Sequence, residues 1–295
     1  MGEDLILEQK HGKARVRVAR AWRQSGKQWI VEWNVNIMLY SECLAAYTNG
    51  DNSDIVATDS MKNTVYAKAK ECADHVPVED FGILLGKHFI ATYSQVTAVT
   101  IKIVEKPWER VWIDGIPHEH GFKLGTEKHT VEININKGGD VKVTSGVEGL
   151  ALLKTTQSGF EGFIRDKYTM LPETKERILA TEVSAKWRYT RKPSCYTDAY
   201  NAVKKTLVDV FFGSPHVGVY SPSVQNTLYF MAQAVMHKFP VVESIHLSMP
   251  NLHFLPVNIS NIVKFDHDVY MPTDEPHGTI EASLTRKDFT GFSKM

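Results

Sequence analysis

Alternating apolar and polar residues mark the first part of the chain as β-structure. Residues 13–20 (KARVRVAR) and 29–35 (WIVEWNV) both repeat with period two, and Ser25-Gly26-Lys27 between them has the composition of a turn. Because successive side chains of a strand point to opposite faces, this pattern predicts a β-hairpin with one polar face.

Helical periodicity then replaces the alternation. Residues 61–73 predict a first helix, which Thr58, Asp59 or Ser60 can cap, and residues 78–93 predict a second, more apolar helix. Alternation returns afterwards, and strands are predicted at 96–104, 107–113 and 118–124.

The second half repeats the order of the first. A turn of composition Asn-Lys-Gly-Gly at 136–139 separates two strands. Strands are predicted at 130–136, 141–145, 179–189 and 241–249, and helices at 197–212 and 221–238. No low-complexity linker separates the halves. We therefore expect an α+β chain made of two tandem units, residues 1–140 and 141–295.

The charges of the chain balance, since Lys and Arg together number 34, as do Asp and Glu. A nucleic-acid-binding protein normally shows a basic excess or stripe, so no nucleic-acid partner is expected. A neutral surface favours self-association. Cys43, Cys72 and Cys195 are widely spaced and form no C-x-x-C pair, which argues against a zinc ribbon or a disulfide framework and fits a reducing compartment.

No membrane partner is expected, and the C-terminal tripeptide is similar to an import signal. No apolar run approaches the roughly 18 residues of a membrane-spanning helix, and the charged N-terminal sequence lacks the apolar core of a signal peptide. Ser293-Lys294-Met295 is similar to Ser-Lys-Leu, which a peroxisomal import receptor recognises, although Met stands in place of Leu. An ordinary chain end is the alternative interpretation of so short a motif.

Motifs for common cofactors are missing from the sequence. It contains no G-x-G-x-x-G at a helix start, no P-loop, no H-E-x-x-H and no G-x-S-x-G. His118-Glu119-His120 and Asp266-His267-Asp268 are the candidates for a metal site. Two imidazoles on one face of a strand without a third ligand make a poor site, and the second group lies in a polar loop, so no metal is expected.

Two segments bring polar groups to the start of a helix. Residues 55–60 (IVATDS) place Thr58 and Asp59 where N–H groups can meet an anion or a polar ligand. Residues 221–227 (SPSVQNT) open another helix, and the Gln225 amide offers the donor and acceptor that an amide-like ring edge requires. Taken alone, both segments are also explained as helix caps.

A third segment follows a strand. Residues 249–254 (MPNLHF) place Asn251 and His253 two positions apart, so both side chains can face one pocket. Taken alone, a histidine in a strand is also explained as a structural residue.

In combination, these segments resemble urate oxidase, also called uricase, and in particular its plant-type members. The matching blocks are 55–64 (IVATDSMKNT), 153–163 (LKTTQSGFEGF), 220–229 (YSPSVQNTLY) and 248–253 (SMPNLH). The resemblance extends from about His11 to the C-terminus. Several blocks in the right order make it highly specific. The stretch at 191–195 departs from the family pattern.

The resemblance implies a tunnelling fold (T-fold), in which each chain has two tandem antiparallel units with helices packed on one face. It also implies that four chains close into barrels as a homotetramer with active sites at subunit interfaces. Lys13 and Thr58 would then serve a site whose other wall belongs to a neighbouring chain. The family needs no metal, flavin or haem, so no cofactor is expected.

A binding site for urate, a planar anion with amide-like edges, is implied as well. Arg177 would supply a planar fork for bidentate contact, Gln225 would grip the opposite edge, and Phe160 would stack on the purine face. Backbone groups of Val224 and Asp59 would complete the contacts in the plane of the ring.

Three residues are implied to handle protons, namely Lys13, Thr58 and His253. Thr58 would also bind urate through its hydroxyl, Lys13 would lower the proton affinity of that hydroxyl, and His253 would tune Lys13. Asn251 would hold dioxygen, and later water, above the ring. Urate and dioxygen would form a peroxo adduct, lose hydrogen peroxide and add water to give 5-hydroxyisourate.

Two alternatives remain open. A pterin or purine cyclohydrolase-like enzyme would share the fold, but such enzymes usually need zinc and clustered Cys and His ligands. A non-catalytic purine-binding protein would have no need of the proton relay. The leading hypothesis is an active urate oxidase of the peroxisome, with urate and dioxygen as its small-molecule partners.

Overall fold

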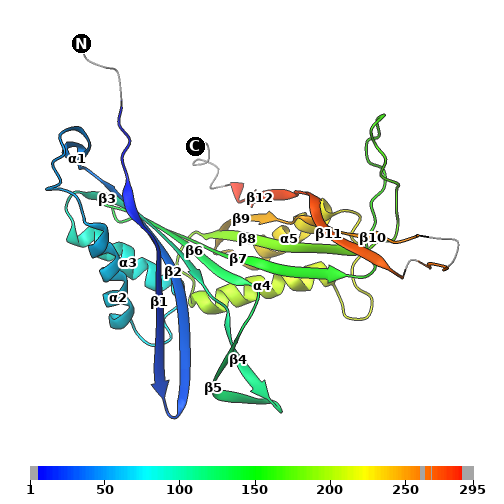
Figure 1. The fold of residues 1–295 in the computed structure, drawn as a ribbon, viewed down its shortest axis with the longest axis horizontal. Helices are drawn as coiled ribbons and strands as arrows, with labels where there is room; N and C mark the ends of the chain where they lie inside the picture. Colours follow the sequence, from blue (N-terminus) through cyan, green and yellow to red (C-terminus); the bar gives the residue numbers. More distant parts are fainter. Residues whose placement is uncertain (1–5, 260–262, 267, 288–295) are drawn as a thin grey trace. The chain divides into compact units, whose positions relative to one another are not determined.

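The structure, a computed structural model, describes residues 6–259, 263–266 and 268–287 (Figure 1). The chain divides into two compact units, residues 1–145 and 146–295. The predicted boundary after residue 140 comes directly before the strand β7 (Val141–Lys154), whereas the structural division falls within that strand. His267 and the tripeptide Ser293-Lys294-Met295 lie outside the described residues.

The first unit is built on an antiparallel sheet in the strand order β1-β2-β3-β6. The strands of this sheet are β1 (His11–Gln24), β2 (Lys27–Ser41), β3 (Val96–Glu105) and β6 (Lys128–Asn136). The helices of the unit are α1 (Leu44–Thr48), α2 (Thr58–Glu71) and α3 (Val78–Thr92). A separate hairpin consists of β4 (Trp108–Ile113) and β5 (Ile116–Leu124).

Alternation along β2 determines which face of this sheet is buried. Trp33, Val35, Ile37 and Leu39 are all at most 1% exposed. The Trp33 ring stacks on Phe81 of α3, with 4.3 Å between the ring centroids. Helices α2 and α3 therefore cover the apolar face of the sheet (Figure 1), and each large side chain buried there contributes about 1.5–3 kcal/mol to stability.

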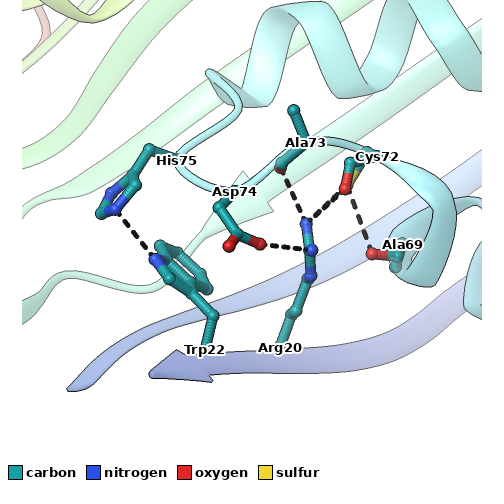
Figure 2. A network of polar contacts seen from close by, with 7 residues as sticks. All are labelled: Arg20, Trp22, Ala69, Cys72, Ala73, Asp74 and His75. Atoms are coloured by element: carbon teal, nitrogen blue, oxygen red, sulfur yellow. Dashed lines mark hydrogen bonds and ion pairs between the residues drawn. The ribbon is translucent and has the colours of Figure 1, made fainter. Parts of the chain in front are cut away.

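Arg20 fastens the C-terminal end of α2 to β1, as Figure 2 shows. Its guanidinium donates to the carbonyl oxygens of Cys72 and Ala73, each at 2.8 Å, and to Asp74 Oδ1 at 2.7 Å. A cation at this end of a helix satisfies carbonyl groups that lack partners within the helix and favours the helix dipole. Helix α2 is thereby held along β1, which determines where its opposite, N-terminal end lies.

The second unit is organised around the strand β8, which neighbours β7. Along its other edge β8 pairs first with β10, through Ala180 and Leu252, and then with β9, starting at Ser184 and Ser248. β12 pairs with β9, and β11 pairs with β10. These strands are β8 (Leu179–Tyr189), β9 (Val242–Ser248), β10 (Asn251–Pro256), β11 (Tyr270–Gly278) and β12 (Glu281–Thr285).

Two helices, α4 (Tyr196–Phe212) and α5 (Val224–Lys238), pack against each other in this unit, and α5 also contacts β9 and β12. Trp187 of β8, Leu207 of α4 and Met231 of α5 are buried at their apolar interfaces. None of the helices in the described part of the chain is long and apolar enough to cross a membrane.

The predicted α+β class, the antiparallel sheets and the paired helices of each half are confirmed. The predicted turn at Ser25-Gly26 is also confirmed, since both residues have positive φ. The prediction that Thr58, Asp59 or Ser60 caps the first long helix is wrong, because that helix begins at Thr58 and its N-cap is Ala57. The sequence prediction also misses α1 and the strands β11 and β12, gives no bounds for β10, and makes β7 too short.

Candidate active site

Lys13 lies in β1 beside a β-bulge. The pairing of β1 with β2 shifts directly after Lys13, and Arg15, with a φ of 58°, donates its N–H to Asn36 Oδ1 at 2.9 Å. A Cβ on Gly12 would lie only 1.9 Å from the Ile37 oxygen, so only glycine permits this close approach of the backbones. The bulge and the close approach together position the half-buried Lys13 side chain, which lines a cavity of about 250 Å³.

Thr58 is the exposed first residue of α2. Ala57 before it has no side-chain cap, so the first N–H groups of the helix have no acceptor from a cap or from the helix. A hydrogen bond of 3.0 Å between His11 Nε2 and the Val56 oxygen joins the start of β1 to the segment that leads into α2. The structure thus brings Lys13 and Thr58 to the same end of the sheet.

Asp59 supplies a negative charge at this helix start. Its exposed carboxylate accepts hydrogen bonds from Lys62 Nζ at 2.6 Å and Asn63 Nδ2 at 2.8 Å. The hydrogen bond and charge of Lys62 first, and then Asn63 and the charge of Lys13, lower the pKa of Asp59. The carboxylate is therefore engaged within its own helix, and the backbone N–H of Asp59 is the group left for a ligand.

Arg177 and Phe160 form a cation–π pair in the second unit. The guanidinium carbon lies 5.5 Å from the Phe160 ring centroid, and Phe163 stacks on the Phe160 ring at 4.8 Å. Buried Ser158 holds Arg177 twice, since its carbonyl oxygen accepts from the Arg177 N–H at 2.9 Å and its hydroxyl accepts from Nε at 3.3 Å. Burial lowers the pKa of Arg177, but a guanidinium stays protonated at neutral pH. A planar cation is thus held beside an aromatic ring.

Helix α5 begins at Val224 and not at residue 221 as predicted. Its cap is Ser223, whose hydroxyl accepts from the Asn226 N–H at 3.1 Å. The N–H groups of Val224 and Gln225 have no carbonyl partner within the helix, and such groups can bind a polar ligand. The Gln225 side chain is exposed beside them.

Asn251 and His253 occupy alternate positions of β10, so they lie on one face of the strand. Leu252 between them pairs with Ala180 of β8. The pairing of β10 with β11 is irregular between the two positions, and both residues are half-buried. The two side chains therefore lie where the regular sheet is interrupted.

Lys154, at the end of β7, is a residue that the sequence prediction misses as a candidate for the site. Its Nζ donates to the Val219 oxygen and to Ser221 Oγ, both at 2.7 Å. Ser221 belongs to the segment that leads into α5 and therefore lies near Val224 in the chain. The only signal in the sequence is that Lys154 falls within the family-like block at 153–163.

Two further features lie apart from the predicted site residues. A cavity of about 490 Å³ lies between α4 and α5, where Asp209, Phe230 and His237 are among its lining residues. The rings of His118 and His120 are 4.6 Å apart, but within the described ranges no group of three or more His, Cys, Asp or Glu residues could hold a metal ion.

Comparison with known proteins identifies the family. The family model described as uricase matches residues 9–134 and 143–281. The chain belongs to the uricase family. It is 62% identical to Uricase-2 of Phaseolus vulgaris over 297 residues, covering 96% of each chain. It is 60% identical to the uricase of Arabidopsis thaliana over 299 residues, covering 96% of this chain and 97% of the relative.

A solved uricase structure shares the fold. The crystal structure of uricase from Arthrobacter globiformis superimposes with a TM-score of 0.89 at 35% identity. The match covers 100% of this chain and 98% of that one. The antiparallel sheets with helices described above are therefore the fold of this family.

The predicted site residues form two groups, one in each unit. The first unit holds Lys13, Thr58 and Asp59, which the His11–Val56 hydrogen bond and the bulge in β1 bring together. The second unit holds Phe160, Arg177, Val224, Gln225, Asn251 and His253.

Proposed function

We propose that this chain oxidises urate with dioxygen and water to 5-hydroxyisourate and hydrogen peroxide. Its family makes it an oxidoreductase that acts on urate. The observation that carries the proposal is the pairing of Arg177 with Phe160, 5.5 Å apart, in the same unit as the open start of α5. A guanidinium, an aromatic face and free N–H groups are the groups that a planar anion with amide edges requires.

In the proposed complex, urate lies on the Phe160 ring. Arg177 forms two hydrogen bonds to one edge of the substrate, and its charge balances that of the urate anion. The Val224 N–H and the Gln225 amide bind the opposite edge, because an amide can donate to a carbonyl oxygen of urate and accept from a ring N–H. The Asp59 N–H and the Thr58 hydroxyl bind a further edge.

Proton movement in this proposal runs through Thr58, Lys13 and His253. Urate gives two electrons to dioxygen, which then needs two protons to leave as hydrogen peroxide. The Thr58 hydroxyl passes a proton, Lys13 accepts or returns it, and His253 tunes the proton affinity of Lys13. Asn251 holds dioxygen and then water above the ring. One urate, one dioxygen and one water give one 5-hydroxyisourate and one hydrogen peroxide, and the reaction needs no metal, flavin or haem.

Oxygen consumption tests the proposed function directly. Purified, metal-stripped protein is mixed with urate while urate absorbance, dissolved oxygen and hydrogen peroxide are followed together. We expect the three signals to change in equal molar amounts. Loss of urate without oxygen uptake, or no reaction by folded protein, would refute the proposal.

The two groups of site residues lead to a proposal about assembly. We propose that the chain forms a homotetramer of tunnelling-fold barrels, in which the Lys13–Thr58 group of one chain completes the Arg177 group of another. Two impaired variants, Lys13→Met and Arg177→Ala, are then expected to complement each other when they are co-expressed and assayed at a urate concentration well below the Kd of Arg177→Ala. Random mixing should restore activity at about a quarter of the sites, since that share combines two intact halves. Absence of any recovered activity in mixed oligomers would contradict this arrangement.

We also propose that Ser293-Lys294-Met295 directs the protein to peroxisomes through the import receptor. A fluorescent reporter that carries these terminal residues should enter peroxisomes, and a reporter without them should not. A diffuse signal from the first reporter would reject this proposal.

A further inference from the structure

Lys154 is a half-buried lysine whose ammonium group is fully engaged. Besides the Val219 oxygen and Ser221 Oγ, both at 2.7 Å, Nζ lies 3.5 Å from the Phe211 oxygen as a donor. It also lies 5.4 Å from the Phe211 ring centroid. Within the described part of the chain, no carboxylate forms an ion pair with it. A cation buried without an anionic partner costs stability, so packing alone does not account for a lysine at this position.

Ser221, which binds Lys154, is a junction between three pieces of chain. Its hydroxyl also accepts from Thr227 Oγ1 at 2.6 Å, in the first turn of α5. Its N–H donates to the Gln157 oxygen at 2.8 Å, and its carbonyl oxygen accepts from the Gly159 N–H at 3.0 Å. The segments around residues 158 and 221 are thus joined by an isolated parallel β-bridge between Ser158 and Ser221.

The Tyr220 side chain packs closely against Gly159, which adds to the contact between these segments. A Cβ on Gly159 would lie 2.1 Å from the Tyr220 hydroxyl and 2.8 Å from the Thr174 oxygen. The Tyr220 hydroxyl in turn donates to the Lys175 oxygen at 3.1 Å. A shift of the segment at 219–221 would therefore displace its neighbour at 157–160.

Each of the joined segments leads into one wall of the proposed urate site. The segment at 157–160 carries Phe160, and its Ser158 holds Arg177 through two hydrogen bonds. The segment at 221–223 leads into α5 and so positions Val224 and Gln225. The ammonium group of Lys154 binds Val219 and Ser221, where the two segments meet.

We propose that Lys154 is a positioning residue for urate binding, which holds the Phe160–Arg177 wall and the Val224–Gln225 wall at the spacing of the substrate. This inference rests on the proposed function. The positive charge of Lys154 also favours an anionic substrate over distances longer than a hydrogen bond, although the residue makes no contact with the substrate itself.

The titratable groups around the junction come from three elements. Asp209 of α4, His237 of α5 and Tyr220 of the connecting segment line the cavity that Ser221 and Thr227 also line. Burial alone lowers the pKa of Lys154, to about 8. Lys154 is therefore charged at neutral pH and has its three hydrogens available for its three acceptors.

The experiment compares Lys154→Met, Lys154→Arg and wild type. Urate binding is measured without oxygen by calorimetric titration, and kcat and KM are measured with oxygen. We expect Lys154→Met to raise both the Kd and the KM of urate about tenfold. Its kcat should stay within about threefold of wild type, because the relay residues are untouched. Lys154→Arg keeps the charge and donors and should restore Kd to within about threefold. The control is Lys123→Met, which removes an exposed lysine of β5 and should leave both constants unchanged.

Several outcomes overturn the inference. Wild-type Kd in Lys154→Met would do so, as would a loss of kcat at constant Kd. If Lys154→Met does not fold, Ser221→Ala becomes the deciding variant, because it keeps the lysine and removes one of its acceptors. Ser221→Ala should raise the Kd of urate about threefold, and an unchanged Kd would refute the role of the junction. If wild type binds no urate, the proposed function fails first, and if it binds urate without oxidising it, the binding test of Lys154 still decides.

Discussion

The guanidinium of Arg177 lies 5.5 Å from the Phe160 ring centroid, and its Nε donates to the Ser158 hydroxyl, while the Arg177 backbone N–H donates to the Ser158 carbonyl oxygen. A side chain restrained by a hydrogen bond and by an aromatic ring loses less conformational entropy when it binds a ligand, so the planar fork of Arg177 is partly organised in advance. This arrangement supports the proposed role of Arg177 in binding a rigid planar anion.

Arg177→Ala is expected to raise the Kd of urate about tenfold to a hundredfold, because two charge-assisted hydrogen bonds and the balancing charge are lost. Arg177→Lys should not restore binding, since an ammonium lacks the planar fork. The matched control is Arg165→Ala, which removes an exposed arginine 5.3 Å from the Phe163 ring. Anaerobic titration with urate measures the affinity of all three variants. A near-wild-type affinity in Arg177→Ala would count against the proposed contact of Arg177 with urate.

Thr58→Ala and Lys13→Met are expected to lower kcat about a hundredfold or more while Kd changes much less, because proton transfer is lost and most of the substrate contacts remain. Ser60→Ala is the control, since Ser60 is another exposed hydroxyl residue of the same helix turn. Steady-state oxygen uptake and anaerobic binding separate the two constants. Unchanged turnover in both site variants would refute the relay.

Local periodicity predicts the parts of this fold that depend on one buried face. The alternation of β2 and the apolar spacing of α3 are visible in sequence because Trp33 and Phe81 each lie on a continuous apolar stripe. Helix starts depend on tertiary contacts as well, so Thr58 is predicted as a cap although it is the first helical residue. The proposed site roles of Arg177 and His253 come from the family resemblance and not from periodicity.

Lys154 shows why a residue beside the candidate site is not predictable from local pattern. A lysine at the end of a strand is ordinarily a solvated residue. Its burial depends on acceptors at Val219 and Ser221, which are 65 and 67 positions away in the chain. Only the folded structure brings these groups together.

Gly12→Ala is expected to lower both stability and kcat, because the added methyl group would lie 1.9 Å from the Ile37 oxygen and would push apart β1 and β2 beside Lys13. Overpacking of this kind costs about 1–3 kcal/mol. Gly138→Ala is the control, since its nearest neighbour is the Asn136 side chain at 3.3 Å. Chemical denaturation and oxygen uptake measure the two effects. A Gly12→Ala variant with full activity would show that Lys13 does not depend on this close approach.

Glu79 should contribute to stability above acidic pH. It is fully buried, and its Oε1 accepts from His129 Nε2 at 3.0 Å and from Ser145 Oγ. Burial raises its pKa, but the hydrogen bond and charge of His129 and the Ser145 hydroxyl outweigh burial, so the pKa is lowered. A lowered folded-state pKa gives stability that is present above the unfolded value, about 4.5, and is lost as pH falls through the folded value. Burial raises the pKa of Glu105, so the contribution of Glu105 to stability decreases as the pH rises, opposite to that of Glu79.

Glu79→Gln is therefore expected to lower the free energy of unfolding at neutral pH by about 3 kcal/mol. The free energy of unfolding of this variant should also decrease less than that of wild type as the pH falls. Glu71→Gln removes an exposed glutamate paired with Lys68 and should change stability by less than about 1 kcal/mol. Urea denaturation between about pH 3 and pH 7 measures both. Equal acid sensitivity in wild type and Glu79→Gln would assign the acid transition to other groups.

The charge of Lys154 should make urate affinity depend on pH above neutrality. Since burial lowers the pKa of Lys154 to about 8, the ammonium loses its proton as pH rises through that value. The protein then loses a positive charge and a hydrogen-bond donor at the Ser221 junction, so the Kd of the urate anion should increase with pH. Lys154→Arg keeps its charge throughout and leaves Asp209, Tyr220 and His237 in place. Anaerobic titrations from about pH 7 to pH 9 should therefore show a rising Kd in wild type and a nearly constant one in the arginine variant. Parallel curves for the two proteins would mean that another group titrates, and that the lysine contributes its hydrogen bonds without its charge.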